Sequence, residues 1–487
     1  MAGTWIHARL SSSLNAQELW ADMYRSRIAR HKAKIVEYEW EVEKCVEIQK
    51  SLTAPASYPV LSLPNEIMSE IFVHCLPDPS ERSDFYALTT NTKLAPFLLL
   101  QVCSKWRRLA IATPMLWTAL CLDFETPMHF FEAVILESFL SDFVMRAGSV
   151  PMSLDLIGNV EEQEDGQRVL STLFNHVSPR LERLNLDTDI KYYHLLSFSF
   201  PRLRELSLGH GFNYEEDLAN LEDHPIQTFR DTPLLQELYL FSGARPSQYT
   251  LQWKALSVLR ADAFTSQDCV DALLLAPSLT SCTVGEVVSQ PNLPNVLHSN
   301  MKGFDIYSFG GPYTLFQALA FPNLETLKMH YVDTDNVHVV EFISRFATSL
   351  LKLFAADVSL RSLHEMSLLT QLELSSPSTD FVTELLAKLN RTKHPSFLPQ
   401  LQVVELGDCE PCHLNLALVH ALSSRLRGDG VKLRTFRQIW APRFEGIQVN
   451  WEEGIGSSLE KLRLESGMET YVGVPEYDPY RWIRSGL

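Results

Sequence analysis

The chain has 487 residues, 46% of them hydrophobic and 21% charged, which is typical of a globular protein of two or three domains. Its 42 basic and 59 acidic residues give a formal net charge of -17. This acidic balance argues against nucleic-acid binding, because such binding depends on neutralising phosphates with Lys and Arg.

Three absences in the sequence limit where the protein is expected. The N-terminal sequence MAGTWIHARLSSSLNAQ lacks the continuous apolar segment of a secretory signal. No segment approaches the roughly 18 apolar residues of a membrane span. The 8 cysteines are scattered along the chain, which favours reduced thiols over a disulfide framework. We therefore expect a protein of the cytoplasm, the nucleus or both, neither secreted nor associated with a membrane.

Residues 15–52 contain no Pro or Gly and predict one N-terminal helix. Its apolar positions recur every seven residues in two rows that His31 and Gln49 interrupt: Ala21, Ile28, Ile35 and Val42, and Tyr24, Tyr38, Cys45 and Leu52. The pattern fits a coiled coil or a single helix that lies on the next domain, and the sequence leaves both open. The segment TAPASYPVLS, with two prolines, then ends the helix.

The segment LPNEIMSEIFVHCL, from Leu63 to Leu76, predicts a second helix. Pro64 suits the first helical position, and Glu66 lies near the positive end of the helix dipole. The apolar residues form two adjoining stripes, which is more than one core-facing side of a helix requires: Ile67, Met68, Ile71, Phe72, Cys75 and Leu76. A further helical pattern, LLLQVCSKWRRLAIAT, ends before Pro114, and LWTALCLDF then alternates like a strand.

From about Val150 onward the motif Leu-x-x-Leu-x-Leu recurs along the chain. Clear copies begin at Leu181, Leu203, Leu235, Leu279, Leu324, Leu369, Leu401 and Leu459, and less regular copies at Leu256, Met301, Leu350 and Leu433. Before them, VPMSLDL predicts an opening strand. The copies are mostly separated by the 20–29 residues of leucine-rich repeats, and each copy predicts one short strand. The connecting segments return the chain, often as a helix such as FVTELLAKLN.

The predicted fold class is therefore α/β, with helical N-terminal parts followed by an irregular leucine-rich-repeat solenoid. The expected divisions are an N-terminal helix at 15–52, a helical domain at 60–120, repeats at 150–470 and a C-terminal tail at 471–487. Stacking of the repeats would bury a continuous core that no single repeat can bury alone.

The segment Leu63 to Leu120 resembles an F-box domain. The resemblance comes from LPNEIMSEIF, LLLQVCSKWRRLA and TPMLWTAL, in that order. The loop between the two helices is longer than is usual in that family. Together with the N-terminal helix and the repeats, the segment is similar to the large group of fungal F-box proteins.

The resemblance implies a non-enzymatic adaptor of an SCF-type ubiquitin ligase. The F-box would dock onto a Skp-type linker subunit, which holds the cullin and its associated ubiquitin-transfer subunits. The linker-binding residues that match the family's pattern are Leu63, Pro64, Ile67, Ile71, Val102, Cys103 and Trp106. Three more apolar residues fit either the partner surface or the core: Phe72, Leu99 and Trp117. The alternative for the whole set is the ordinary core of one helical domain.

The concave face of the repeat sheet is the expected site for an unidentified client protein. In each copy the leucines point inward, and the alternate residues point to the concave side. In the middle of the array these alternate residues are Tyr239, Phe241, Arg260, Asp262, Asp305, Tyr307, Lys328, His330 and Phe354. Aromatic residues beside charges are typical of binding surfaces, although a solvated face with incidental aromatics is an equally good interpretation. A second function fits the same residues, a leucine-rich-repeat scaffold that acts outside a ligase.

Sequence motifs for catalysis or cofactors are sparse. The run Cys409-Glu410-Pro411-Cys412-His413 has the spelling of a haem-attachment or metal motif, but no second Cys pair accompanies it to complete four zinc ligands. Phosphate-binding loops, nucleophile elbows and H-E-x-x-H motifs are absent from the sequence. We therefore expect no enzymatic activity, no cofactor and no metal.

Overall fold

The computed structural model contains two compact units, Met1–Glu70 and Ile71–Leu487. It describes residues 32, 34, 38, 40, 42–44, 60–77, 93–123, 133–158, 164–188, 193, 198–210, 225–285, 287–308, 311–334, 336–356, 358–409, 416–426, 430–440 and 455–473. Within these residues, no helix combines the length and the apolar character that crossing a membrane requires.

In the unit Met1–Glu70, Lys32, Lys34, Tyr38, Trp40 and residues 42–44 are helical. The side chains of Tyr38 and Trp40 are exposed. The rest of the predicted helix at 15–52 lies outside the described residues, and so do most of its heptad positions. Coiled-coil pairing therefore stays a prediction.

The predicted helical domain contains α2 (Asn65–His74), α4 (Leu99–Val102) and α5 (Ser104–Ile111), with short 3-10 turns at Val60–Ser62 and Pro114–Trp117. The single helix predicted from Leu98 to Thr113 is wrong, because Cys103 is extended (φ -160°, ψ 169°) and separates α4 from α5. The Cys103 Sγ atom accepts a hydrogen bond from the Trp106 N–H at 3.5 Å, so this residue caps α5. The loop at 78–92 lies outside the described residues.

Within the unit Ile71–Leu487, an aromatic cluster around Trp117 joins α5 to the first part of the repeat array. Trp117 is fully buried, and its Nε1–H donates to the carbonyl of Ala110 at 2.9 Å. Its ring lies 5.9 Å from the ring of Phe97 and 5.3 Å from that of Phe143 on α6 (Ala133–Ala147). Helix α5 and the turn at Pro114–Trp117 therefore share a core with α6.

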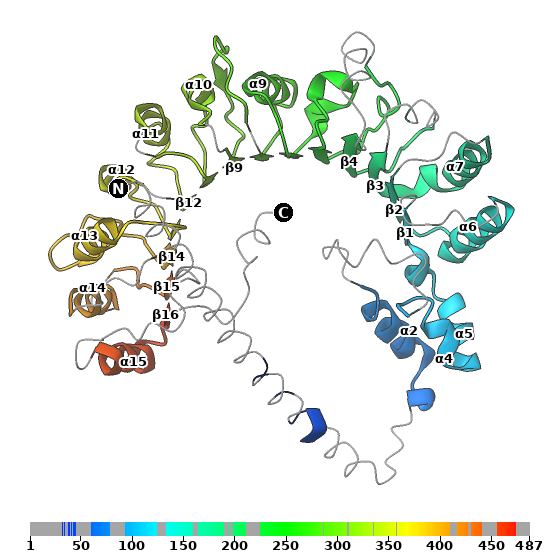
Figure 1. The fold of residues 1–487 in the computed structure, drawn as a ribbon, viewed down its shortest axis with the longest axis horizontal. Coiled ribbons are helices and arrows are strands. Elements are labelled where there is room, and N and C mark those ends of the chain that lie inside the picture. The colour runs from blue at the N-terminus through cyan, green and yellow to red at the C-terminus, as the bar shows by residue number, and fades with distance from the viewer. Residues whose placement is uncertain are drawn as a thin grey trace, which may run out of the picture. The chain divides into compact units, whose positions relative to one another are not determined.

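The repeat array is one long parallel sheet whose strands follow chain order (Figure 1). Among the described residues it has fourteen strands: β1 (Ala119–Asp123), β2 (Met152–Ile157), β3 (Leu181–Thr188), β4 (Glu205–His210), β5 (Glu237–Phe241), β6 (Val258–Ala261), β7 (Ser281–Val284), β9 (Gly303–Tyr307), β11 (Thr326–His330), β12 (Lys352–Ala355), β13 (Gln371–Leu374), β14 (Val403–Cys409), β15 (Thr435–Trp440) and β16 (Glu469–Gly473). Two short strands, β8 (Val296–Leu297) and β10 (Leu319–Ala320), form a separate pair. The chain is thus a mixed α/β protein with a long parallel sheet.

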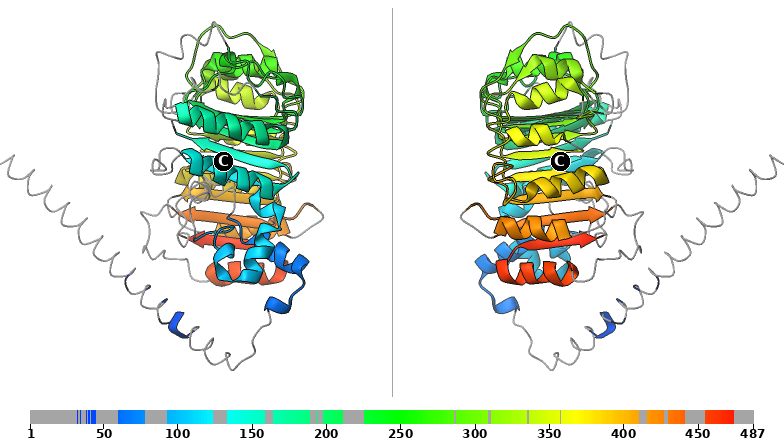
Figure 2. Two further views of the ribbon diagram at one scale, coloured as in Figure 1. Left: turned by 90° about the vertical axis from the view of Figure 1, so that its right-hand side faces the viewer. Right: turned by 90° about the vertical axis from the view of Figure 1, so that its left-hand side faces the viewer.

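In the unit Ile71–Leu487 the strands line the inner curve of an arc, and the helices lie on its outer side (Figure 1). These helices are α6, α7 (Glu164–Val177), α9 (Ser266–Leu275), α10 (Tyr313–Ala318), α11 (Val337–Ser344), α12 (Leu360–Glu365), α13 (Thr379–Leu389), α14 (Leu416–Leu426) and α15 (Ile455–Ser466). The helix predicted at FVTELLAKLN is confirmed as α13. Figure 2 shows the same layers from two sides.

The repeated leucines form the core between the sheet and the helices. In the ladder, Leu238 on β5 is the register partner of Leu206 on β4 and of Leu259 on β6, and all three are buried. Alternate positions of the same strands are less buried, so one side of each strand faces the helices and the other faces the inner curve. This alternation is the pattern that the motif predicted.

One predicted repeat strand is wrong. The copy that begins at Leu459 is part of helix α15, and the last strand is instead β16. Leu459 and Leu462 are buried, while Leu464 is 73% exposed. The motif's first two leucines are three residues apart, a spacing that also fits a helix. Lys461 and Arg463 are helix formers, and the copy lacks the β-branched and aromatic residues that favour strands.

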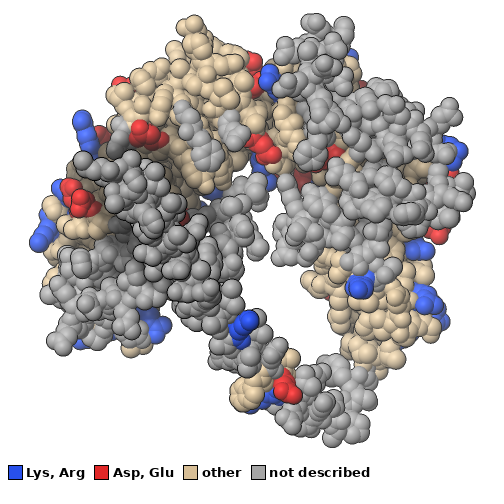
Figure 3. All heavy atoms as spheres, in the orientation of Figure 1, with Lys and Arg blue, Asp and Glu red and all other residues tan. Residues whose placement is uncertain are grey.

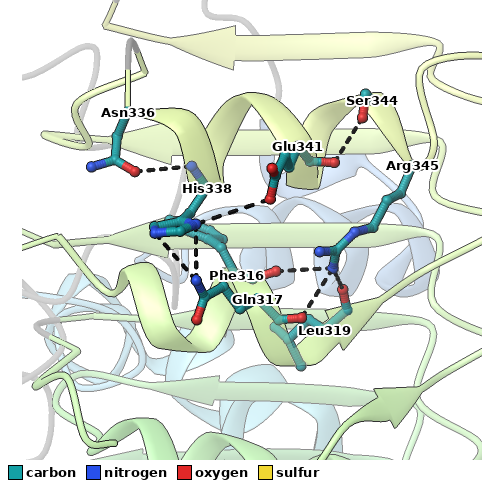
Figure 4. A network of polar contacts seen from close by, with 8 residues as sticks. All are labelled: Phe316, Gln317, Leu319, Asn336, His338, Glu341, Ser344 and Arg345. Carbon is teal, nitrogen blue, oxygen red and sulfur yellow. Dashed lines mark hydrogen bonds and ion pairs between the residues drawn. The ribbon is translucent and has the colours of Figure 1, made fainter.

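Polar contacts connect neighbouring repeats on the outer side, as Figure 4 shows for α10 and α11. The Arg345 Nη1 atom donates hydrogen bonds at 2.8–3.2 Å to the main-chain carbonyls of Phe316, Gln317 and Leu319. The Gln317 Nε2 atom lies 2.9 Å from Nδ1 of His338. These contacts satisfy carbonyls near the end of α10 and hold the two helices in register.

Candidate functional site

Helix α2 has one buried and one exposed apolar stripe. Met68 and Phe72 are 2% and 0% exposed, whereas Ile67 and Ile71, one position earlier in each turn, are 51% and 42% exposed. Residues four apart lie on the same side of a helix, so each pair belongs to one stripe. Pro64, just before the helix, is exposed, and Leu63 is half-buried. Exposed apolar side chains at this spacing are suited to contact with another protein.

In α4 and α5 the predicted linker-binding residues differ in exposure. Val102 is 52% exposed, while Cys103 and Trp106 are half-buried. The Trp106 ring centroid lies 4.9 Å from that of Phe72. Within the described part of the chain, the buried Nε1–H of Trp106 has no hydrogen-bond partner. The three residues assigned to either the partner surface or the core are all buried: Phe72, Leu99 and Trp117.

The inner face of the sheet carries the residues predicted for client binding. The register aligns five of them with Thr283 in one row across neighbouring strands: Tyr239, Arg260, Asp305, Lys328 and Phe354. The other predicted residues lie two positions further along their strands: Phe241, Asp262, Tyr307 and His330. The structure therefore brings residues from five repeats onto one surface.

Tyr239 and Phe241 form the aromatic part of this surface on β5. Their ring centroids are 5.2 Å apart, and both side chains are half-buried. The Tyr239 hydroxyl donates to the Asp262 carboxylate. Phe241 lies against Gly209 on β4, where the absence of a side chain leaves room for its ring. Tyr239 is thus fixed by a hydrogen bond and Phe241 by close packing.

A second cluster surrounds Asp305, which is only 7% exposed. The Lys328 Nζ atom lies 3.8 Å and the His330 Nε2 atom 3.3 Å from its carboxylate oxygens. The His330 ring stacks on Tyr307 with centroids 4.0 Å and planes 3° apart. Burial, with a smaller contribution from Asp305, raises the pKa of the Tyr307 hydroxyl, which therefore stays neutral at physiological pH. Lys328 also lies over the Phe354 ring, with Nζ 5.2 Å from the centroid.

Some inner-face residues were not singled out from the sequence. Glu205 and Glu237 occupy the position just before the second leucine of their copies, so the rule applied to the middle repeats identifies them too. Arg437 on β15 pairs with Glu405, at 3.4 Å, and with Glu469. Tyr331 is 64% exposed after β11 with a positive φ of 60°, a conformation that no simple sequence pattern predicts.

Acidic and basic side chains are both visible on the described residues of the face in Figure 3, and neither kind forms a large continuous field there. Cys409 lies at the end of β14, and residues 410–413 of the Cys-x-x-Cys-His run are outside the described residues. Among the residues that are described, no three His, Cys, Asp or Glu side chains are grouped so as to hold a metal ion. The arrangement on the inner face offers stacking surfaces and ion pairs, which are means of binding.

No known protein family matches this chain, and no curated protein matches it. Among solved structures, the chain is similar to one described as the crystal structure of a TLR13-ssRNA13 complex, with a TM-score of 0.37 and 12% sequence identity. The match covers 73% of this chain and 61% of that chain, so this chain spans about three fifths of the length of the protein it matches. The leucine-rich-repeat-like fold is therefore described from its own strand ladder and leucine pattern.

Proposed function

We propose that the protein is a substrate-recognition adaptor of an SCF-type E3 ubiquitin ligase. Exposed residues of the F-box-like segment would bind a Skp-type linker subunit, and the inner face of the sheet would bind a client protein. The observation that carries the proposal is the pair of stripes on α2. Ile67 and Ile71 are exposed beside the buried Met68 and Phe72, as a helix requires if a second polypeptide is to cover one side of it.

Burial of the exposed residues is large enough to matter energetically. Complete burial of one Ile or Val side chain contributes about 1.5–3 kcal/mol, so Ile67, Ile71 and Val102 together offer several kcal/mol. Part of this is offset by the translational and rotational freedom lost on association. Such a surface supports specific binding only if most of these side chains are covered at once.

The adaptor would contribute proximity and no chemistry of its own. A client on the inner face and a ligase on the helical segment would be joined through one chain. This raises the effective concentration of the client at the ubiquitin-transfer machinery. The rigid, aromatic-rich inner face supports the client-binding half of this proposal, since Tyr and Arg side chains are frequent at the centres of protein interfaces.

The second candidate function is a leucine-rich-repeat scaffold that acts outside a ligase. The inner-face cluster of Tyr239, Asp305 and His330 supports client binding in either case, so this surface does not distinguish the two functions. Only the exposed stripe on α2 and the F-box resemblance favour the ligase. Binding to the linker subunit therefore separates them.

The direct experiment measures binding of the full chain to a purified Skp-type linker by calorimetry. We expect Ile67→Ala, Ile71→Ala and Val102→Ala together to weaken binding at least about 100-fold, as three lost side chains imply. The combination Leu63→Ala with Pro64→Ala should abolish linker binding and leave the repeats folded. A matched control is Val337→Ala with Leu464→Ala, because both side chains are exposed on helices elsewhere, at 58% and 73%.

Two outcomes would decide against the adaptor. Absence of binding between the wild-type chain and the linker would leave the scaffold as the function. Equal weakening in the control and in the α2 and α4 variant would show that the contact is not specific to these residues. Circular dichroism of every variant establishes that the fold is retained.

A further inference from the structure

The inner face of the sheet is not evenly charged along its length. On strands β2 to β6, and on the residue that follows β6, five acidic and two basic side chains face the inner curve: Asp155, Asp187, Glu205, Glu237, Asp262, Arg183 and Arg260. On β9 to β16 the two signs are nearly equal: Asp305, Glu373, Glu405, Glu469, Lys328, Lys352 and Arg437. The excess of negative charge therefore lies on the β2–β6 part of the face, which we name the acidic strip.

Several cations of the inner face form ion pairs with acids of the same chain, and this includes one of the two cations of the acidic strip. Arg183 pairs with Asp155, a residue that is 2% exposed and whose carboxylate lies 3.3 Å from the guanidinium. Elsewhere on the face, Lys328 faces Asp305 and Arg437 faces two glutamates. Most cations of the inner face are thus occupied by acids of the same chain.

In the described part of the chain, the carboxylates of Glu205 and Glu237 are not paired in this way. The two residues are register partners on β4 and β5, so their side chains are neighbours on the same face. Neither carboxylate has an ion pair or hydrogen bond with any described residue. Like charges directly opposite each other in a sheet are destabilising. A cation placed between them from another molecule would relieve this repulsion.

The residues beside this pair favour one kind of cation. Glu237, Tyr239 and Phe241 alternate along β5 and share the inner face, about 7 Å apart at each step. An aromatic ring next to a carboxylate suits a guanidinium, which stacks flat on the ring and forms paired hydrogen bonds to the acid. Asp262, which accepts a hydrogen bond from the Tyr239 hydroxyl, adds a second carboxylate next to that side chain.

From this geometry we infer that the client protein is recognised through an arginine-rich segment that lies on the acidic strip. One arginine would stack on Tyr239 and pair with Glu237, and another would bind beside Glu205. This inference rests on the proposed client-binding function of the inner face and adds the chemical class of the client. Arg260 opposes this binding. It is exposed, it is the register partner of Tyr239, and its positive charge repels a basic ligand.

The test uses the full chain and a fluorescent eight-residue peptide of alternating Arg and Gly, followed by anisotropy at low and physiological salt. Peptides with Lys or Glu in place of Arg are the comparison probes. We expect the Arg peptide to bind more tightly than the Lys peptide, and the Glu peptide not to bind. The variant Glu205→Gln with Glu237→Gln should weaken binding of the Arg peptide about tenfold or more. Arg260→Gln should strengthen it about threefold, since it removes the positive charge beside Tyr239.

A matched control is Glu365→Gln with Glu384→Gln, which changes the net charge equally at two exposed sites on α12 and α13. Equal weakening in this control would mean general attraction to an acidic protein and would overturn the inference. Binding of the Glu peptide more tightly than the Arg peptide would also overturn the inference, since the face would then bind anions. The same holds if the Glu peptide binds the wild-type chain and this binding is lost in Arg260→Gln.

The same variants are assayed for binding to the Skp-type linker, and we expect no change. If the wild-type chain binds the linker but does not bind the Arg peptide, only the arginine-rich client is rejected. Peptide binding in a chain that does not bind the linker supports the client class and rejects the ligase. The two proposals can therefore fail separately.

Discussion

Gly209 on β4 and Phe241 on β5 occupy register positions that are directly opposite each other, and the aromatic ring fills the space where a Gly209 side chain would be. This close approach fixes the position of the ring at the edge of the acidic strip. A Cβ atom at Gly209 would lie too close to the Phe241 ring, so the ring would have to move to make room for it.

We expect Gly209→Ala to lower the free energy of unfolding by about 1–3 kcal/mol, because the added methyl group displaces the Phe241 ring. In a background with Phe241→Ala, the same substitution should cost much less. Urea denaturation of the four proteins in this double-mutant cycle measures the coupling. An equal cost of Gly209→Ala in both backgrounds would show that the ring is not what excludes the side chain.

Truncation to Ala should destabilise the protein strongly at Trp117 and very little at Ile71. Trp117 is fully buried among aromatic rings, so Trp117→Ala should lower the free energy of unfolding by about 3–5 kcal/mol. Ile71 is 42% exposed, so Ile71→Ala should change it by about 0.5 kcal/mol or less. Thermal unfolding without any linker subunit makes the comparison. A large loss with Ile71→Ala would mean that this side chain belongs to the core of the free protein.

Arg425 on α14 is a buried arginine, 2% exposed, whose guanidinium donates to three main-chain carbonyls at 2.6–2.8 Å: Leu389, Phe397 and Leu398. Burial lowers its pKa to about 10, so it remains charged at neutral pH. We expect Arg425→Met to lower the free energy of unfolding by about 3 kcal/mol or more, because three buried carbonyls lose their donor. Arg361→Met, on the exposed surface of α12, is the control and should change stability by about 0.5 kcal/mol or less. Similar urea midpoints for the two variants would contradict this role.

The buried thiols should make the protein sensitive to alkali. Burial, and to a lesser extent Asp305, raises the pKa of Cys282 to about 12, and burial also raises the pKa of Cys269. The folded pKa exceeds the unfolded value near 8.5, so this stability is fully present below about pH 8.5 and is lost as pH rises toward 12.

Two measurements follow from these thiols. The urea midpoint should fall as pH is raised from about 9 to 11, and the fall should be smaller in Cys282→Ala. Alkylation of the native protein at neutral pH, followed by mass spectrometry, should modify the exposed Cys75 well before Cys269 or Cys282. Early labelling of Cys282 would contradict its burial.

The repeat architecture could be predicted from the sequence, because in the repeats the spacing of the leucines follows directly from which side chains are buried. Leu206, Leu238 and Leu259 are buried because they are alternate residues of strands, and the motif records that alternation directly. The same parity placed Tyr239 and Tyr307 on the inner face. It failed at Leu459, where leucines three apart fit a helix as well as a strand.

Other features depend on tertiary contacts that a local pattern does not contain. Ile67 and Met68 are both apolar neighbours on α2, and only packing decides that one is exposed and the other buried. The extended backbone of Cys103, which divides one predicted helix into α4 and α5, has no local signal such as Gly or Pro. The ion pair between Asp305 and Lys328 required the register between β9 and β11, which links residues one repeat apart.

In the described part of the long sheet, each strand pairs with the strands that come before and after it along the chain, and the short β8 and β10 form their own pair. Fraying that starts at one end of such an array removes outer repeats one at a time, while each remaining repeat keeps its own neighbours. The binding surface from β4 to β12 is several strands away from the terminal strand β16. Unravelling at the carboxyl end would therefore leave this surface intact, which gives the middle of the array a tolerance to damage that a single closed core does not have.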